Sequence, residues 1–438
     1  MLLKSLHRCW IIWAGVSLSL QGGPYSAALN DALNSYDAPV PGFVGPHGVG
    51  AARLLTGFDE FGEPIYQNPS NYVNPVFFDW AASVTHYDRS DGGSSFSNSS
   101  LALGEVTGDL FDTVSLGDLT ATQITAGVLP GSITLQLSKP IQNFSGADFV
   151  VYENGVISQS NQGGAGIGGI FAELAYVEVS ADGVNFLRFP STSLTTSAVG
   201  GYGTINPTNV NNLAGKHANS YEKSWGTPFD LAQLELSQIT HIRLVDIPGN
   251  GAFKDQAGRS IFDSWRTTGS GGFDLEALGS ISTRMTYGDW PQLAKLDPAD
   301  RDAEDDPDGD GLTNLIEYAF ARLPWTADAG GALPTCRLVT AVGGIYPELK
   351  FLRDERLIDL TYEVQVSASM LANDWSTIAI SSAGAAVVPV MGNLSVVSES
   401  SAGTIQSVGV VREVRLRSAV PIATQTKQFF RVKVYQSL

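Results

Sequence analysis

Cysteine is almost absent from this chain of 438 residues, which contains Cys9 and Cys336 alone. Cys9 lies in an apolar N-terminal run that is typical of a removable signal. The single cysteine that remains after its removal cannot form an internal disulfide. Paired cysteines at zinc-ligand spacing are missing too, so we expect stability to come from buried apolar surface and from bound calcium.

Positive charge is scarce. Lysine and arginine number 26 against 44 aspartates and glutamates, which gives a formal charge of -18 at pH 7. Such an excess of carboxylates repels the phosphates of nucleic acids and the headgroups of anionic membranes, so we expect neither as a partner. Charged residues make up only 16% of the chain, while glycine and short β-branched runs are frequent. This composition is typical of a secreted β-rich protein.

Several catalytic and nucleotide-binding motifs are missing. The sequence has no G-x-S-x-G elbow, no H-E-x-x-H pair, no P-loop and no dinucleotide-binding fingerprint, which argues against serine hydrolases, zinc hydrolases and nucleotide enzymes. Glycoside hydrolysis requires two suitably spaced carboxyls, and its candidates here are Glu153, Glu173 and Asp274. The competing interpretation of these residues is turn chemistry or calcium binding. An extracellular carbohydrate-active enzyme therefore stays open as an alternative.

Long hydrophobic runs are absent after the N-terminus. Lys4 and Arg8 precede the apolar run 9–20, and small residues up to Ala28 follow it, so residues 1–28 are predicted to be a cleaved signal peptide. An uncleaved anchor is the alternative, but the run is short for a bilayer. We expect a secreted protein, extracellular or at the cell surface, with no transmembrane segment after cleavage.

The strongest motif present is an acidic loop, residues 306–317. It matches the calcium-loop pattern D-x-[DN]-x-[DN]-G-x5-E at every position. Calcium takes six to eight oxygen ligands, and this spacing supplies them from one short segment. The competing interpretation is a solvated acidic linker. The predicted calcium ligands are Asp306, Asp308, Asp310, the Leu312 carbonyl, Asn314 and Glu317.

A helix is predicted directly after the loop, because apolar residues from Leu312 to Leu323 recur at helical spacing and Pro324 stops the run. Together with the preceding acidic run, the loop and helix form a predicted connector over residues 286–334. Calcium in the loop would offset the repulsion among its carboxylates. We therefore expect half an EF-hand that stiffens the joint between two β domains.

The flanking regions predict a mainly β fold. Residues 29–285 contain short apolar strands separated by turns, including a hairpin over 174–189 that turns at Asp182-Gly183. Residues 335–438 contain further alternating strands and no helix of note. The predicted fold is thus a jelly-roll-like β-sandwich over 29–285 and a small all-β domain over 335–438, joined by the short helical connector.

A second calcium site is a further hypothesis for the region 29–285. Oxygen ligands from separate loops would hold a cation at the rim of a sandwich. Exposed aspartate is also common in turns, which is the alternative. The candidates, all at strand ends or in loops, are Glu153, Asp246, Asp263 and Asp274.

Two tryptophans and a histidine are candidates for binding a glycan or another extracellular ligand. Trp225 and Trp265 lie in polar, glycine-containing segments, and His217 lies in a polar loop. A flat aromatic ring with neighbouring polar groups suits the apolar face and hydroxyls of a sugar. Burial in the core is the alternative for each tryptophan.

Three stretches carry a resemblance to known proteins. The run 147–155 and the pattern V-x-V-S-x-D-G-x-x-F over 177–186 resemble a β-sandwich domain of bacterial cell-surface proteins and galactose-binding-like jelly rolls. The stretch DPDGDGLTNLIEYA resembles dockerin and thrombospondin type 3 calcium loops, followed here by a small C-terminal β module. The resemblance implies a secreted or surface protein that binds calcium. We expect it to be non-enzymatic and to bind carbohydrate or a surface protein through the sandwich; a purely structural surface protein is the remaining alternative.

Overall fold

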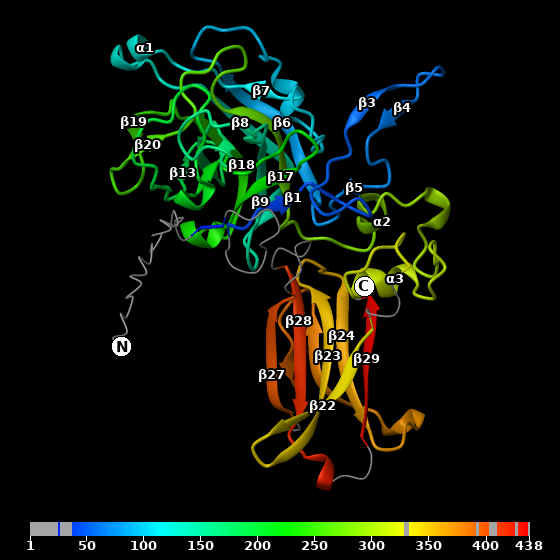
Figure 1. Ribbon diagram of the computed structural model, residues 1–438. Helices are drawn as coiled ribbons and strands as arrows, with labels where there is room; N and C mark the ends of the chain where they lie inside the picture. Colours follow the sequence, from blue (N-terminus) through cyan, green and yellow to red (C-terminus); the bar gives the residue numbers. More distant parts are fainter. Residues whose placement is uncertain are drawn as a thin grey trace, which may run out of the picture.

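The computed structural model describes residues 25–26, 37–327, 333–390, 394–402, 410–424 and 428–436. The protein is mainly β, with 40% strand and 9% helix, as the sequence predicts. Figure 1 shows two β-rich bodies, one coloured blue to green and one yellow to red, with the short helices α2 and α3 beside their junction. The predicted signal peptide lies outside the described residues except for residues 25 and 26. Within the described residues, no helix is both long and apolar enough to cross a membrane.

The N-terminal domain is built on one antiparallel sheet of 11 strands, in which nine follow the order β1-β17-β9-β21-β6-β8-β18-β12-β13 while β16 pairs with β12 and β7 with β21. The bounds of these strands are β1 Val40–Pro41, β6 Asp79–Asp88, β7 Val114–Ser115, β8 Ser132–Gln142, β9 Phe149–Glu153, β12 Ala175–Ser180, β13 Leu187–Arg188, β16 Leu213–Ala214, β17 Trp225–Phe229, β18 Gln238–Asp246 and β21 Asp274–Ser280.

The sheet curls until its two ends share one core. Phe149 and Phe229 belong to β9 and β17 at one end of the strand order, whereas Phe189 directly follows β13 at the other end. The ring centroids of Phe189 lie 6.0 Å from Phe149 and 5.1 Å from Phe229. Burying three aromatic rings together provides a large apolar area for this closure.

A short helix and five two-stranded pairs lie outside the large sheet. The helix α1 is Ala121–Thr125, and the pair β3–β4 projects from the body as a hairpin (Figure 1). The five two-stranded pairs are β2 Phe43–Val44 with β5 Tyr72–Val73, β3 Leu55–Phe58 with β4 Pro64–Tyr66, β10 Val156–Ile157 with β11 Ile170–Phe171, β14 Thr192–Ser193 with β15 Val210–Asn211, and β19 Asn250–Lys254 with β20 Ser260–Phe262.

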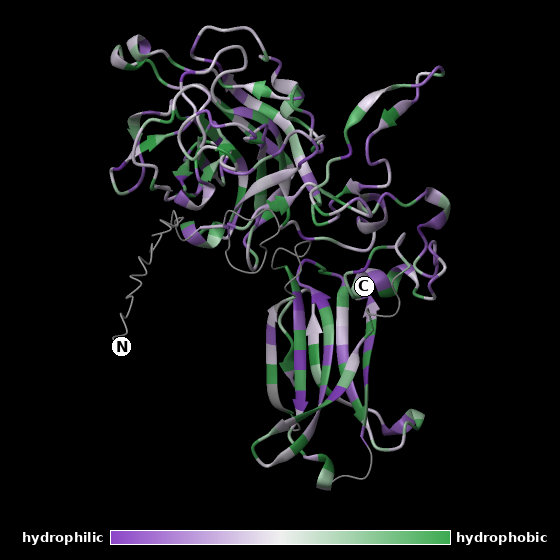
Figure 2. Ribbon diagram, in the orientation of Figure 1, coloured by the Kyte–Doolittle hydropathy of each residue, from purple (hydrophilic) through white to green (hydrophobic). Residues whose placement is uncertain are grey.

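The C-terminal domain consists of two four-stranded antiparallel sheets. Figure 2 shows hydrophilic and hydrophobic residues alternating along its strands, the pattern expected when one face of each sheet is buried. Phe351 of one sheet and Tyr362 of the other stack with centroids 6.1 Å apart. The sheets are β22 Thr335–Ala341, β23 Gly344–Asp354, β28 Val411–Ser418 and β27 Leu394–Ser401, and β26 Val388–Pro389, β25 Ser376–Ser382, β24 Leu360–Ser367 and β29 Phe429–Gln436.

The connector packs onto the C-terminal domain. Its helices are α2 Trp290–Leu293 and α3 Asn314–Ala319. The Tyr362 hydroxyl donates to the Ala319 carbonyl at 2.6 Å, and Tyr318 and Phe320 belong to the same hydrophobic core as Tyr362. The connector and the C-terminal sheets therefore share one core, so anything that orders the connector also stabilises this domain.

Candidate metal centre

Three aspartates gather in the predicted calcium loop. Side-chain oxygens of Asp306, Asp308 and Asp310 lie within 4.8 Å of one another, and within the described part of the chain no other group of three or more Asp, Glu, His or Cys side chains is that close. The loop bends at Gly309 and Gly311, whose φ angles are +74° and +91°. Glycine adopts such left-handed angles without a steric penalty, which explains why the turn falls at these positions.

Backbone amides hold the carboxylates in place. Asp306 accepts hydrogen bonds from the Gly309 and Gly311 amides at 3.0 and 2.9 Å. Asp308 accepts from the Asp310 amide at 3.1 Å, and Asp310 from the Leu312 amide at 2.8 Å. Each aspartate is thereby oriented before a cation arrives, which reduces the conformational entropy lost on binding.

The three charges repel one another. Burial raises the pKa of Asp308, and repulsion by Asp310 and Asp306 raises it further, while the hydrogen bond from the Asp310 amide acts in the opposite direction. Asp308 also has a buried carboxylate oxygen, Oδ2, that accepts no hydrogen bond. A cation placed among the three carboxylates would supply both the missing positive charge and a partner for this oxygen.

Asn314 at the ninth position is fully buried. Its Nδ2 donates to the carbonyls of Asp300 and Asp302 at 2.8 and 2.9 Å, which ties the preceding acidic run to α3. Its Oδ1 has no hydrogen-bond partner. Asn314 therefore offers a second orphaned oxygen from a position that calcium loops use for a direct or water-bridged contact.

Glu317 lies on α3 and is fully buried, but it is not part of the 4.8 Å group of Asp306, Asp308 and Asp310. It contributes to the raised pKa of the neighbouring Tyr287, which reaches about 12 mainly through burial and then through repulsion by Asp305. The donors brought together are all oxygens, and they fit a hard cation such as calcium. The structure thus shows an aspartate cluster able to hold a metal ion, while the contacts of Leu312 and Glu317 to the metal stay predictions.

No model of a known protein family matches the chain, and no curated protein matches it. The observations that bear on function are thus the mainly β fold, this aspartate cluster and the placement of the other candidate residues.

The four carboxylates predicted for a second metal all lie inside the N-terminal domain. Glu153, Asp246, Asp263 and Asp274 are at most 2% exposed. They do not form a group of three oxygens within 4.8 Å, unlike the loop aspartates. Burial raises the pKa of each of them, because a charged carboxylate is poorly solvated there.

Two of the three expected glycan contacts are buried. Trp225 and His217 are each 2% exposed. The His217 Nε2 lies 3.2 Å from the Asp37 carbonyl, and burial followed by repulsion from Lys216 lowers the pKa of this imidazole to about 3. Both side chains are thus enclosed in this structure, which for Trp225 is the alternative of core burial, while a contact to a ligand stays a prediction. Trp265 is half-buried and donates through Nε1 to the Leu119 carbonyl at 3.1 Å.

Sequence reasoning missed a buried ion pair beside His217. Lys216 is fully buried and pairs with Asp37 at 2.5 Å, while its Nζ also donates to the Val210 carbonyl at 2.7 Å. A lysine is seldom buried without such a partner. Its partner lies 179 positions away, so no local pattern could have revealed the pair.

A cavity of 380 Å³ lies where the two domains meet. Ser145 lines it from the N-terminal side, and Arg353, Glu355 and Glu399 line it from the C-terminal side. Arg353 already pairs with Glu399, and Glu355 accepts from the Ser145 amide at 2.8 Å. Because these charged groups are satisfied by one another, the cavity gives no sign of ligand chemistry.

Proposed function

We propose that this is a secreted or cell-surface protein that binds calcium at the loop 306–317 and has no enzymatic activity. The observation that carries the proposal is the cluster of Asp306, Asp308 and Asp310, accompanied by the orphaned oxygens of Asp308 and Asn314. Oxygen donors in this number and spacing favour calcium over the softer metals that take nitrogen and sulfur ligands.

Calcium would act on structure. Binding offsets the repulsion in the acidic run and orders the loop against α3, and α3 shares its core with the C-terminal sheets. For an extracellular calcium module with a dissociation constant on the order of 10⁻⁴–10⁻³ M, millimolar calcium adds roughly 0.4–1.4 kcal/mol of stability. We therefore expect calcium to raise the stability of the C-terminal domain, in addition to stiffening the joint between the two domains.

Binding of carbohydrate or another extracellular ligand stays part of the proposal for the N-terminal domain. Its support is the half-buried Trp265 and the curled antiparallel sheet, which suits a jelly-roll-like domain. The alternative of a carbohydrate-active enzyme is less well supported, because Glu153, Glu173 and Asp274 are at most 4% exposed. A polysaccharide could reach these carboxyls only if the surrounding loops opened.

Calcium titration of the mature chain by calorimetry tests the loop. The double variant Asp308→Asn with Asp310→Asn, called here the loop-disabled chain, should bind one calcium fewer than the wild type. The matched control is Glu304→Gln, which removes an exposed charge from the same acidic run outside the loop. Equal calcium uptake by the wild type and the loop-disabled chain would overturn the proposal.

A further inference from the structure

Six buried carboxylates lie at the same end of the strands of the large sheet. We call them the buried carboxylate cluster. They come from six separate segments, at the ends or starts of β9, β18 and β21 and in the loops beside β7, β12 and β20. All are between 1% and 4% exposed: Asp118, Glu153, Glu173, Asp246, Asp263 and Asp274.

Hydrogen bonds to the segment 267–273 bring three of these carboxylates together. The Thr267 amide donates to Asp118 Oδ2 at 3.0 Å, the Gly272 amide to Glu173 Oε1 at 2.9 Å, and the Phe273 amide to Asp246 Oδ1 at 2.8 Å. Asp274 is the next residue along the chain. Four members of the cluster therefore surround one short stretch of backbone.

Positive charge does not balance the cluster. Among the ion pairs of the described residues, none involves any of its six carboxylates. Arg89 is the cation that acts on Asp274, yet its guanidinium pairs with Asp91 at 2.8 Å and donates to the Gly269 carbonyl at 3.1 Å.

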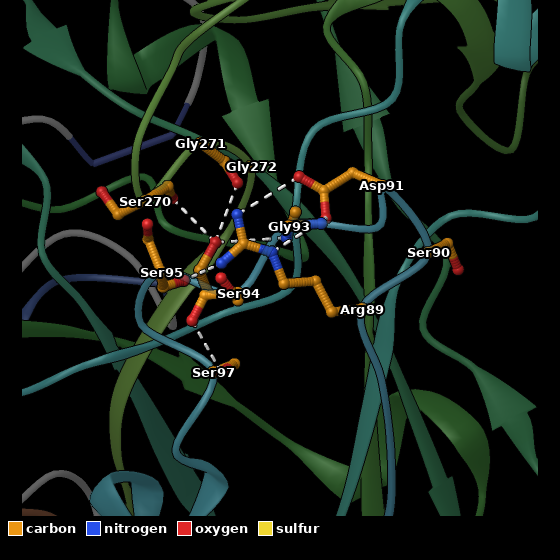
Figure 3. A network of polar contacts seen from close by, with 12 residues as sticks. Arg89, Ser90, Asp91, Gly93, Ser94, Ser95, Ser97, Ser270, Gly271 and Gly272 are labelled. Atoms are coloured by element: carbon orange, nitrogen blue, oxygen red, sulfur yellow. Dashed lines mark hydrogen bonds and ion pairs between the residues drawn. The ribbon is translucent and has the colours of Figure 1, made fainter.

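Figure 3 shows that Arg89 lies between Asp91 and the segment that carries Ser270, Gly271 and Gly272. Arg266 acts on Asp118 from a position exposed to solvent.

The carboxylates also repel one another. Burial raises the pKa of Glu153 and Glu173 well above the usual value, and repulsion by Asp274 adds to it. Burial likewise raises the pKa of Asp246, and repulsion by Asp118 adds to it. The members thus lie close enough to one another to interact through their charges.

An independent observation points to a ligand. Four members have one oxygen that accepts a hydrogen bond and a second, buried oxygen that accepts none. The bonded oxygens are Asp118 Oδ2, Glu153 Oε2, Asp246 Oδ1 and Asp274 Oδ2, with donors from Thr267, Gly155, Phe273 and Asn154. The orphaned oxygens are Asp118 Oδ1, Glu153 Oε1, Asp246 Oδ2 and Asp274 Oδ1. The Ser115 and Ser270 hydroxyls lie near Asp274 and partly offset the rise in its pKa that burial causes, but the Ser115 hydroxyl donates to the carbonyls of Ser270 and Gly271.

A buried carboxylate with only a structural role normally has hydrogen bonds to both of its oxygens. Asp148 provides the contrast inside the same domain, because it is fully buried and yet both of its oxygens are satisfied, Oδ1 by the Phe144 amide at 3.0 Å and Oδ2 by the Leu231 amide at 2.7 Å. Buried polar atoms are rarely left unpaired in folded proteins. Four orphaned carboxylate oxygens in one buried cluster therefore call for a partner that carries positive charge.

We propose that the buried carboxylate cluster binds a divalent cation, calcium, at a second site that is independent of the loop 306–317. The orphaned oxygens of Glu153 and Asp274 supply two carboxylate ligands, since their strands β9 and β21 pair and Glu153 lies opposite Leu275, the neighbour of Asp274. No three carboxylates of the cluster come within 4.8 Å of one another, so backbone carbonyls or water must complete the shell. Calcium tolerates such irregular oxygen shells, whereas magnesium demands a tighter octahedron.

The experiment uses the loop-disabled chain, in which the first site cannot contribute. Equilibrium dialysis against calcium at neutral pH should show one residual equivalent bound per chain, and calcium should raise its melting temperature. Adding Asp274→Asn should abolish the residual uptake. The matched control Asp148→Asn changes a carboxyl that is equally buried but has no orphaned oxygen, so it should leave the uptake unchanged.

A folded loop-disabled chain that takes up no calcium would overturn the proposal. This result needs no substitution inside the cluster, so it decides the matter even if Asp274→Asn fails to fold. The two proposals fail differently. Without a loop site, the wild type and the loop-disabled chain bind equally; without a cluster site, the loop-disabled chain binds nothing.

Discussion

Arg356 and Asp354 form a buried ion pair on the turn between β23 and β24, with Nη2 of Arg356 2.5 Å from Oδ2 of Asp354. Nη1 of the same guanidinium donates to the carbonyls of Val76 and Ile281 in the N-terminal domain, each at 2.9 Å. One cation thereby joins the two domains. This turn is therefore one of the points at which the two domains are held together.

Replacing Arg356 by methionine should uncouple the domains. The substitution removes the bonds to Val76 and Ile281 and leaves Asp354 buried without its cation, which costs about 3–5 kcal/mol. Calorimetry should then show separate melting of the two domains. Arg337→Met is the control, because its ion pair with Glu348 is largely exposed on the arginine side and should contribute less than about 1 kcal/mol. Identical melting of the wild type and Arg356→Met would contradict this account of the interface.

Asn314→Ala should separate the structural role of the loop from its metal role. The variant loses two hydrogen bonds to the carbonyls of Asp300 and Asp302, so urea unfolding in chelator should show a loss of about 1–3 kcal/mol. Asp310→Asn removes a repelling charge, and we expect it to match or exceed the wild type in chelator. With calcium present, both variants should be stabilised less than the wild type. If Asn314→Ala and Asp310→Asn have the same free energy of unfolding in chelator, Asn314 contributes to stability through the metal alone.

Asp148 predicts a pH dependence of opposite sign to that of a paired surface carboxylate. Burial raises its pKa from 3.8 to about 7, against the hydrogen bonds from Phe144 and Leu231 and with repulsion from Asp230. The folded state therefore binds this proton more tightly than the unfolded chain. The resulting stabilisation is fully present below about pH 4 and is lost as pH rises toward 7.

The measurement compares urea unfolding of the wild type and Asp148→Asn at pH 5 and pH 8. The variant should lose less stability between the two pH values than the wild type. Asp182→Asn serves as the control, because hydrogen bonds from the amides of Asn185 and Val184 lower the pKa of this exposed carboxyl below its usual value. Asp182 is therefore ionised in the folded and the unfolded chain at both pH values, and its variant should keep the pH curve of the wild type. A wild type and an Asp148→Asn variant with parallel pH curves would rule out the raised pKa of Asp148.

The sequence predicted local features well. The loop 306–317 is recognisable because its ligands follow one another within twelve residues, and the structure confirms the cluster of Asp306, Asp308 and Asp310. The hairpin at Asp182-Gly183 is confirmed as β12 and β13, although β13 is short. The strand β13 begins only at Leu187, because Asp182 accepts hydrogen bonds from the amides of Val184 and Asn185 and this turn bends the backbone away from β12.

Features that depend on partners far away in the chain could not be predicted from local sequence patterns. Asp118 joins the buried carboxylate cluster through an amide 149 positions away, at Thr267, and no pattern around it announces this. Trp225 lies among polar residues in the sequence, yet it belongs to β17 and faces inward. The strand that carries Trp225 pairs with β1 and β9, which are far from it in the chain.

Gly50→Ala tests the burial of Trp225 directly. A Cβ at position 50 would lie 2.2–2.5 Å from the indole of Trp225, and the φ angle of +73° is itself unfavourable for alanine. Gly48→Ala is the matched control, since Gly48 also has a positive φ of +104° but nothing lies within 4 Å of its added Cβ. Both variants should lose about 1–2 kcal/mol to the backbone angle. Overpacking should cost Gly50→Ala about 1–3 kcal/mol more, and tryptophan fluorescence should report a disturbed indole in that variant alone. Equal loss of stability in the two variants would mean that Trp225 does not pack against Gly50.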